Sequence, residues 1–428
     1  MIYKNRVVRN SIWIIGCHII QAMLSFVVTM LTARYLGPSN YGLINYAASL
    51  VAFLTPIAKL GLDTILINEF VTYPEREGET LGTSMVISLM SSILCIFGLI
   101  TFVSVANQGE PDTIIVCALY SVILIANVLE MTKFWFQTHL LSKYTSIATL
   151  VAYVGKAAYQ IFLLANGSSI YWFAITNALD IFLIDIIITF LYKRNGGQSL
   201  GFSWSTVRRL LSQSRYYIIS SMMVTIFANT DRVMIKMLLG DMETGYYSAA
   251  VTCANMTSFI FAAIINSAHP VILKNHKEDE HKFNKSLTLL YSTIIYLAVA
   301  QSIVIFTCAP VIVNVLYGNE YLAATEPLRW IVWYTLFSYI GSVNWVYVQA
   351  TGNQAILWKL NLIGAIGNVA LNALLIPAMG VNGAAIASLL TQIVTNLISC
   401  FIFHQLRPIL KLMKNSLSPK NFSVFIKK

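Results

Sequence analysis

The residues of this sequence that could do chemistry are ionisable side chains set inside long apolar stretches. Lys59, Asp63 and Lys156 each interrupt such a stretch, as do Asp231 and Arg232. If these stretches cross a lipid bilayer, each charged group costs about 2.5–3.5 kcal/mol on insertion scales. Such groups persist where they face a cavity or one another. Deep cations could bind an anionic substrate, and deep carboxylates could exchange a proton or a sodium ion.

Lys59 and Asp63 lie four residues apart, which puts them on one face of a helix, where they can pair. Pro56 lies nearby and is expected to kink the helix and free a backbone carbonyl. Two interpretations stay open. Either Lys59 binds substrate and Asp63 exchanges an ion, or the two form a buried structural pair.

Lys156 has no residue of opposite charge three or four positions away, and Tyr153 and Gln160 share its helical face. A lone cation at this depth is costly against lipid, so it should point into a cavity or meet an acid from another helix. Asp180 and Asp185, in the following apolar stretch, are the candidate partners. The interpretation favoured here is a cation that lines a path for an anionic substrate.

Asp231, Arg232 and Lys236 form a third cluster, in which Arg232 and Lys236 share a face and Asn229 lies one turn before Arg232. Lys236 is expected to snorkel to the outer interface, whereas Arg232 lies deeper. Asp231 could exchange an ion or form a salt bridge that joins two lobes. Arg34 lies at the end of the first apolar stretch. It is expected either to snorkel to the membrane interface or to bind substrate.

These patterns give two sets of candidates. The candidate substrate-binding residues are Lys59, Lys156, Arg232 and Arg34, and the candidate ion-coupling residues are Asp63, Asp180 and Asp231. Glu130 is expected to be solvated near the inner surface. Three asparagines on one side of a later stretch, Asn361, Asn368 and Asn372, are expected to hold helices together, and His18 is expected to be a packing residue.

Soluble-enzyme motifs are absent from the sequence. There is no Walker A pattern, which argues against nucleotide hydrolysis, and no His, Glu or Cys cluster has metal-ligand spacing. We therefore expect no enzymatic activity, no metal and no cofactor.

The elements that must position these residues are membrane-spanning helices. The chain has 428 residues, of which 57% are apolar and 11% are charged, whereas a soluble domain carries about 25% charged residues. A spanning helix needs about 20 mainly apolar residues. The apolar runs predict an all-α, polytopic membrane protein with about twelve transmembrane helices. The runs are 11–34, 41–66, 82–106, 113–136, 144–165, 170–192, 216–239, 246–272, 287–309, 327–350, 360–377 and 381–404.

The distribution of Lys and Arg orients these helices. If both termini are cytoplasmic, most of the 28 Lys and Arg residues lie on the cytoplasmic side of the membrane, which is the positive-inside pattern. The same pattern accounts for the net charge of +10 without nucleic acid as a partner. The loop at 68–81 is an exception because it is rich in Glu, but acidic residues contribute little to orientation. The basic start followed by a long apolar run predicts a first membrane helix and no cleavable signal peptide.

The basic loop at 192–215 divides the runs into two groups of six. Leu36-Gly37 with Gly42, and Leu239-Gly240 with Gly245, repeat the pattern LG-x4-G about half the chain apart. We therefore predict an N-terminal six-helix lobe at 1–200, and a C-terminal six-helix lobe with a basic cytoplasmic tail at 201–428.

Two segments carry a family resemblance. Residues 31–66, with the core TARYLGPSNYGLINYAASLVAFLTPIAKLGLDTIL, and residues 229–250, NTDRVMIKMLLGDMETGYYSAA, resemble the polysaccharide-repeat (O-antigen and capsule, Wzx-type) flippases. These flippases belong to the superfamily that also contains the multidrug-and-toxin extruders and the peptidoglycan-precursor flippases. Length and number of spans are also similar, so the resemblance covers most of the chain.

The resemblance implies two pseudo-symmetric lobes around a central cavity that opens alternately to either side. The implied cargo is an undecaprenyl-diphosphate-linked oligosaccharide, moved from the inner to the outer leaflet of the bacterial cytoplasmic membrane for surface polysaccharide biosynthesis. The implied cavity is cationic, and Lys59, Lys156 and Arg232 are this chain's counterparts by membrane depth. Membrane lipids are implied partners, and a polysaccharide polymerase complex is a candidate one. Coupling to a proton or sodium gradient, or passive transport down a substrate gradient, all stay open.

Two other functions compete with the flippase. The first is a cation-coupled multidrug exporter of the same fold, which would need an acidic, aromatic site for cationic drugs. The deep basic residues argue against it. The second is a scaffold of the polysaccharide-assembly complex that transports nothing.

Overall fold

The computed structural model describes residues 2–417, with side chains from Ile20 onward. His18 and residues 418–428 of the predicted tail lie outside these described side chains. The chain divides into two compact units, residues 1–237 and residues 238–428. This division falls at the end of a long helix, Trp204–Leu239, and not at the predicted boundary after residue 200. The two lobes of six equivalent helices stay a prediction.

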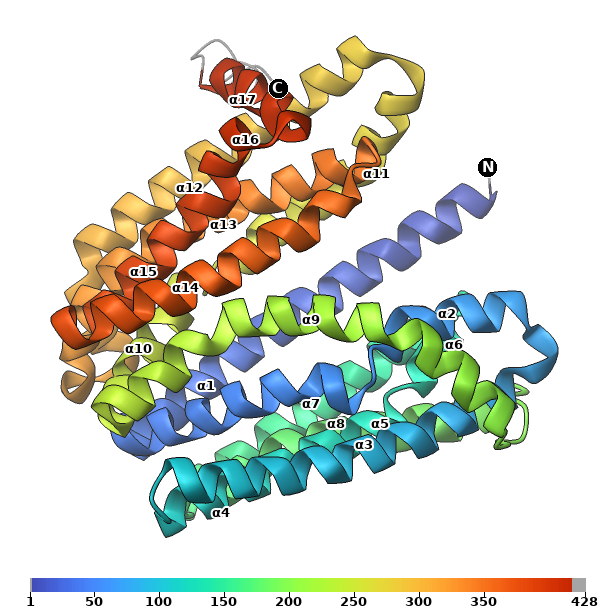
Figure 1. Ribbon diagram of the computed structural model, residues 1–428, viewed down its shortest axis with the longest axis horizontal. Coiled ribbons are helices and arrows are strands. Elements are labelled where there is room, and N and C mark those ends of the chain that lie inside the picture. The colour runs from blue at the N-terminus through green and yellow to red at the C-terminus, as the bar shows by residue number, and fades with distance from the viewer. Residues whose placement is uncertain (1, 418–428) are drawn as a thin grey trace. The chain divides into compact units, whose positions relative to one another are not determined.

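The described part of the first unit is helical throughout (Figure 1). Its helices are α1 (Ile2–Ala58), α2 (Leu62–Thr72), α3 (Glu77–Ala106), α4 (Pro111–Ser121), α5 (Ile123–Leu129), α6 (Thr132–Thr138), α7 (Ser142–Ala165), α8 (Ile170–Arg194) and α9 (Trp204–Leu239), with a 3-10 turn at Pro74–Arg76.

The second unit is helical as well (Figure 1). Its helices are α10 (Asp241–Ala254), α11 (Ser258–Glu278), α12 (Glu280–Tyr317), α13 (Thr325–Ala350), α14 (Leu357–Met379), α15 (Val381–Ile393), α16 (Ser399–Ile402) and α17 (Arg407–Ser416). Short 3-10 turns lie at Asn319–Ala324, Gln354–Ile356 and His404–Leu406, and a π-helical turn lies at Val394–Ile398.

Helix α1 consists of two legs separated at Gly37. Gly37 has φ 72° and ψ 172°, which no helical residue adopts, and the chain reverses direction there (Figure 1). Pro38 begins the second leg, where its missing N–H leaves no helical bond unmade. Gly240, the equivalent glycine of the LG-x4-G repeat, has φ 109° and ψ −172° between α9 and α10. Both glycines of the repeat therefore make the same kind of helix break, which a residue with a Cβ would strain.

The prediction of an all-α, multi-pass membrane protein is confirmed. Among the described residues, nine helical segments are long and apolar enough to cross a membrane, or ten if the bent pair α10 and α11 makes one span. The bent pair corresponds to the run 246–272 of the sequence, and two further differences separate ten spans from the twelve predicted runs. The segment Ile20–Thr72 contains both legs around Gly37, and α13 is diluted by Trp, Tyr, Ser and Asn.

Buried asparagines connect the helices of the second unit. The amide of Asn344 on α13 donates to the backbone oxygen of Asn396 in the π-helical turn at 2.9 Å, and its oxygen accepts from the Tyr291 hydroxyl at 2.7 Å. Asn368 on α14 donates to Ser388 on α15 at 3.4 Å. The predicted packing role of Asn368 is therefore confirmed, because a buried amide in lipid-exposed helices needs a partner across the interface.

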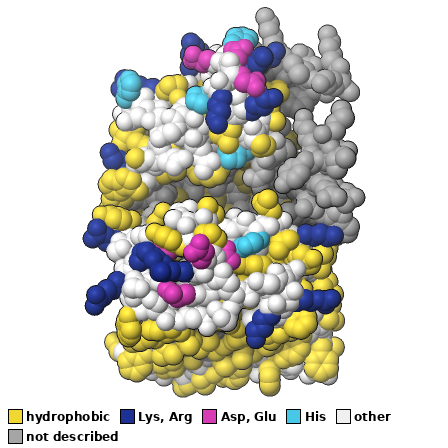
Figure 2. All heavy atoms as spheres, turned by 90° about the vertical axis from the view of Figure 1, so that its right-hand side faces the viewer, with side chains coloured by type: hydrophobic (Ala, Val, Ile, Leu, Met, Phe, Trp, Pro, Cys, Tyr) yellow, Lys and Arg dark blue, Asp and Glu magenta, His cyan; other side chains and the backbone are white. Residues whose placement is uncertain are grey.

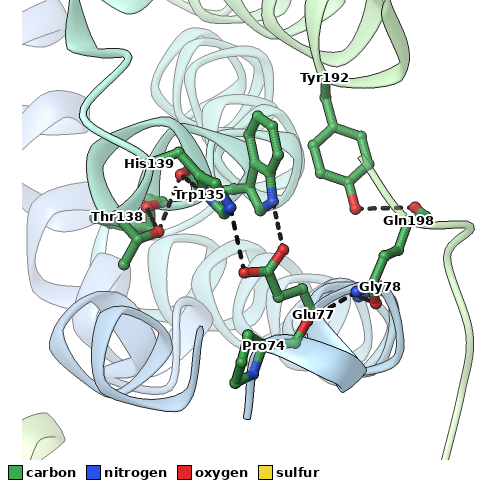
Figure 3. Close-up of polar contacts among 9 residues, drawn as sticks. Pro74, Glu77, Gly78, Trp135, Thr138, His139, Tyr192 and Gln198 are labelled. Carbon is green, nitrogen blue, oxygen red and sulfur yellow. Dashed lines mark hydrogen bonds and ion pairs between the residues drawn. The ribbon is translucent and has the colours of Figure 1, made fainter. Parts of the chain in front are cut away.

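The Glu-rich loop that stood out in the charge pattern anchors other parts of the first unit. Glu77 accepts a hydrogen bond from the Trp135 indole at 2.7 Å and lies 3.5 Å from His139 (Figure 3). Glu69 pairs with Arg209 at 3.0 Å, and Glu79 accepts from Thr206 at 2.7 Å. Figure 2 shows Asp and Glu side chains beside Lys and Arg side chains in its lower part.

The same corner holds the segment between α8 and α9. The Gly78 N–H donates to the Gln198 side chain at 3.0 Å (Figure 3). The Gly78 oxygen accepts from the Gly201 N–H at 3.1 Å. The Gln198 amide donates to the Pro74 oxygen at 2.8 Å, and the Tyr192 hydroxyl donates to the Gln198 oxygen at 2.9 Å. The basic linker of the sequence is thus bound along the start of α3.

We expect Gly78→Ala to loosen this linker. A Cβ on Gly78 would lie 2.2 Å from the Ser199 backbone oxygen, so the linker must move away. Such overpacking costs about 1–3 kcal/mol. The expected result is a lower unfolding temperature in detergent and faster trypsin cleavage after Arg194.

Gly98→Ala is the matched control, because Gly98 lies in the same helix and a Cβ there would meet nothing within 4 Å. It should leave both readouts unchanged or raise the unfolding temperature. Equal behaviour of the two variants would contradict the bound position of the linker.

Candidate functional site

The second leg of α1 breaks inside its apolar run. Lys59 to Gly61 form a turn, in which Leu60 has φ 53° and Gly61 has φ 58°. A Cβ on Gly61 would lie 2.9 Å from the Ile218 backbone nitrogen on α9, so this position needs glycine for space as well as for φ.

The break frees backbone carbonyls, and serines satisfy them. Ser88 and Ser91 on α3 donate to the oxygens of Ala58 and Ile57, each at 2.8 Å. Pro56 lies inside the helix, three residues before this break, so the kink expected at Pro56 itself stays a prediction. Non-helical backbone is tolerated at membrane depth where neighbouring groups satisfy it, and such broken helices hold ligand sites in many transporters.

Lys59 lies at this break and forms an ion pair with Glu130. Glu130 occupies a second break, between α5 and α6, and also pairs with Lys133. The side chains of Lys59 and Glu130 are only 14% and 21% exposed. This cluster, Lys59, Glu130 and Lys133, is called the lysine cluster below.

Two predictions at this place are wrong. Lys59 does not pair with Asp63, whose side chain is exposed, because the positive φ values at Leu60 and Gly61 end the helical register that the four-residue spacing assumed. Glu130 is not simply solvated, because it lies between two lysines.

Asp185 on α8 is a buried carboxyl near the lysine cluster. Its residue is 0% exposed, and within the described chain neither carboxyl oxygen has a hydrogen-bond partner. It lies within electrostatic reach of Glu130, Lys133 and Lys59. From the sequence Asp185 was only a possible partner of Lys156. What sets it apart is its lack of a partner, which no local pattern reveals.

Lys156 on α7 has the partner that its isolation predicted. Its ammonium donates to Asp180 at 3.0 Å and to Asn177 at 2.8 Å, both on α8. The Tyr153 ring centroid lies 5.7 Å from the ammonium. The prediction of an acid from the neighbouring helix is confirmed for Asp180.

A small polar cavity adjoins Lys156. Its volume is about 110 Å³, and it is lined by Ser25 and Thr29 of α1 together with Gln160 and Asn177. Since liquid water occupies about 30 Å³ per molecule, it has room for a few waters and not for a sugar. Lys156 therefore borders a polar cavity, as a cation lining a polar path would.

The third cluster lies near the α3–α4 connection. Lys236 is buried and pairs with Glu110, a half-exposed residue of this connection, at 3.1 Å, and its predicted snorkelling to the outer interface stays a prediction. A hydrogen bond from Thr113 and the charge of Lys236 lower the pKa of Glu110. Arg232 points toward the Asn229 oxygen at 3.4 Å, and the neighbouring Asp231 is buried.

The structure brings together only part of the predicted set. Lys59 joins Glu130 and Lys133, whereas Lys156 joins Asp180 and Asn177. Arg34 is exposed near the break at Gly37. No grouping of three or more metal-ligating side chains occurs among the described residues.

Fold and buried charges together define a multi-pass α-helical membrane protein with ionic clusters inside its spans. The family described as "Polysaccharide biosynthesis protein" matches residues 7–276. The chain belongs to this family.

Three known proteins illustrate the similarity. A Shigella flexneri protein named as an O-antigen transporter is 22% identical over 89% of this chain and 94% of its own length. The solved structure of the lipid II flippase MurJ is 16% identical, covers 98% of this chain and 93% of its own, and has a TM-score of 0.73. A multidrug resistance MATE family transporter is 12% identical, covers 92% of this chain and 96% of its own, and has a TM-score of 0.71. At these identities the two structures establish the fold alone.

Proposed function

We propose that the protein is a flippase that moves an undecaprenyl-diphosphate-linked oligosaccharide repeat unit from the inner to the outer leaflet of the bacterial cytoplasmic membrane. The observation that carries the proposal is the lysine cluster at two helix breaks inside a member of the polysaccharide biosynthesis family. The similar Shigella flexneri protein, named as an O-antigen transporter, supports the same class of cargo.

The physical need for such a protein follows from the cargo. The sugar and the diphosphate would lose their hydration in hydrocarbon, at a cost that prevents unaided crossing. Lysine ammonium groups form strong charge-assisted hydrogen bonds with phosphate oxygens. In the lysine cluster two cations share one glutamate, so positive charge is left to face an anion. The lipid tail can stay in the bilayer while the headgroup crosses by alternating access.

The orientation of transport rests on the positive-inside rule. Both termini are placed in the cytoplasm because most Lys and Arg then lie on that side. In this orientation, the proposed transport takes up the repeat unit at the inner leaflet and releases it at the outer leaflet.

Asp185 is the proposed proton-carrying group. An ionised carboxylate without hydrogen-bond partners is costly to bury, and a bound proton removes that cost. Movement that brings Lys59 or Lys133 closer would favour release of the proton. Asp185 thus takes the coupling role first assigned to Asp63, Asp180 and Asp231, of which Asp63 is exposed and Asp180 is paired with Lys156.

A cation-coupled drug exporter is the second candidate, because the fold also resembles a MATE transporter. Cell experiments separate the two. Deleting the gene should make lipid-linked repeat units accumulate on the inner leaflet and abolish the surface polysaccharide. Increased drug susceptibility with normal surface polysaccharide would favour the exporter instead.

We expect Lys156→Ala to impair export at least about tenfold while the protein stays in the membrane. The reason is that the variant removes the cation beside the polar cavity, and a charge-assisted hydrogen bond from that cation to an anionic substrate would contribute about 1.5–3 kcal/mol. Surface polysaccharide, normalised to protein level, is the measurement.

Lys156→Arg is the matched control, because it keeps the charge and the Asp180 partner, and it should retain part of the export. Normal export by Lys156→Ala would remove Lys156 from the path.

A further inference from the structure

The second unit contains a larger cavity at the end where α11 leads into α12. It has a volume of about 990 Å³ and is bordered by α11, the first turns of α12, the C-terminal end of α13 and α17. Small-molecule sites typically measure about 300–1,000 Å³. None of the candidate substrate-binding or ion-coupling residues lines it.

The lining of this cavity is rich in basic side chains. Lys285 on α12 and Lys411 on α17 approach it from two helices, and both are exposed. His276 and His281 lie beside them, and Glu280 is the one acidic residue of the lining. Figure 2 shows this gathering of Lys, Arg, His and acidic side chains in its upper part.

The neighbouring acids are already occupied. Asp279 caps α12 and accepts from the His281 backbone N–H at 2.8 Å. Glu278 pairs with Lys274 at 3.6 Å, one turn away on α11. Neither of these two acids lines the cavity. Among the residues that line it, the two lysines therefore outnumber the single acid, Glu280.

Polar groups and an apolar floor complete the site. Asn284 and Thr288 offer amide and hydroxyl hydrogen-bond donors, whereas the Thr351 hydroxyl already donates to the Tyr347 backbone oxygen at 3.0 Å. Phe283 and Leu412 are buried at its base, 3% and 5% exposed.

The cavity lies where α12 changes character. Except for the buried Phe283, residues 280–285 of α12 are charged or polar, and the apolar run begins at 287. Leu289 both lines the cavity and is 38% exposed. An anionic group held by the lysines would therefore lie at the level where a membrane lipid places its headgroup, with apolar surface beside it for the chain.

We propose that this cavity binds the phosphate groups of an anionic lipid headgroup, with Lys285 and Lys411 as the counter-ions. Phosphate oxygens that bind both Lys285 and Lys411 would link α12 to α17. The site goes beyond the proposed function, because binding here requires no transport. By the positive-inside rule it faces the inner leaflet, where a lipid-linked diphosphate and ordinary phospholipids are both present.

The test uses the full-length protein, purified in a neutral detergent, and titrates farnesyl diphosphate by calorimetry. The double variant Lys285→Gln/Lys411→Gln should bind about tenfold or more weakly, because each lysine contributes a charge-assisted hydrogen bond. The matched control is Lys277→Gln/Lys282→Gln, which removes the same charge from exposed lysines of the same region that do not line the cavity. The control should bind within about twofold of the unchanged protein.

Competition identifies the source of the phosphate. Displacement of farnesyl diphosphate by phosphatidylglycerol micelles, but not by phosphatidylcholine micelles, supports a bilayer phospholipid. Displacement by inorganic diphosphate alone shows that the phosphates suffice without a lipid chain. Equal weakening in both double variants, or no saturable binding, would overturn the site. Lost binding with normal flipping would leave the proposed function intact, so the two proposals fail separately.

Discussion

Glu130→Gln lowers the stability of the protein by about 3 kcal/mol, because breaking a buried ion pair leaves a charge uncompensated. Lys59 is the residue affected, since it is 14% exposed and loses its partner. Lys133 is 37% exposed and can hydrate its own charge. The expected readouts are a lower unfolding temperature in detergent and less protein in the membrane.

Glu75→Gln is the matched control, because Glu75 is an exposed acid of the Glu-rich loop. Surface charges of this kind change stability by less than about 0.5 kcal/mol. If Glu130→Gln unfolds at the same temperature as Glu75→Gln, the ion pair between Lys59 and Glu130 contributes nothing and the lysine cluster loses its basis.

Asp185→Asn should abolish the response of transport to a proton gradient while the protein stays folded. The amide has nearly the same shape as a protonated carboxyl and cannot exchange a proton at neutral pH. Flipping driven by an inward proton gradient is therefore expected to fall by about tenfold or more. The measurement compares initial flipping rates in liposomes with and without the gradient.

Asp63→Asn is the control for this experiment, since Asp63 is exposed. It should keep the gradient response. A retained response in Asp185→Asn would show that Asp185 is only structural, and no response in the unchanged protein would point to a sodium-coupled or passive route.

The sequence predicted well the features that depend on local residue patterns and on the free-energy cost of placing a charge inside a membrane. The two legs around Gly37 follow from two apolar runs and a glycine, and the partner of Lys156 follows from the cost of a lone cation in a membrane. Asp180 could be named as a candidate partner of Lys156 because it lies on α8, the helix that directly follows α7.

It could not predict contacts that depend on breaks in the helices. The pairing of Lys59 with Glu130 joins residues 71 positions apart and requires two helix breaks to meet. Leu60 adopts φ 53°. Because leucine rarely adopts a positive φ, the residue type gave no indication of this break. The four-residue spacing of Lys59 and Asp63 assumed a continuous helix, and that assumption failed.

The linker after α8 was equally hidden. From the sequence it was only a basic loop between two groups of helices, whereas Gly78 and Gln198 bind it to the start of α3. The surplus of Glu at 68–81 was noted only as an exception to the charge pattern, and the contacts of these acids were not predicted. Those contacts join residues far apart in the sequence, which local patterns do not reveal.

Transport of lipid-linked oligosaccharide in a defined system tests the central claim most directly. Liposomes containing the purified full-length protein are loaded with undecaprenyl diphosphate that carries a short fluorescent oligosaccharide, and a membrane-impermeant quencher is added outside. In liposomes without protein, only the label of the outer leaflet is quenched. With the protein, we predict that the inner-leaflet label is also quenched over time, and that Lys156→Ala slows this phase. Quenching that stops at the level of empty liposomes, under proton, sodium and no gradient alike, would contradict the account.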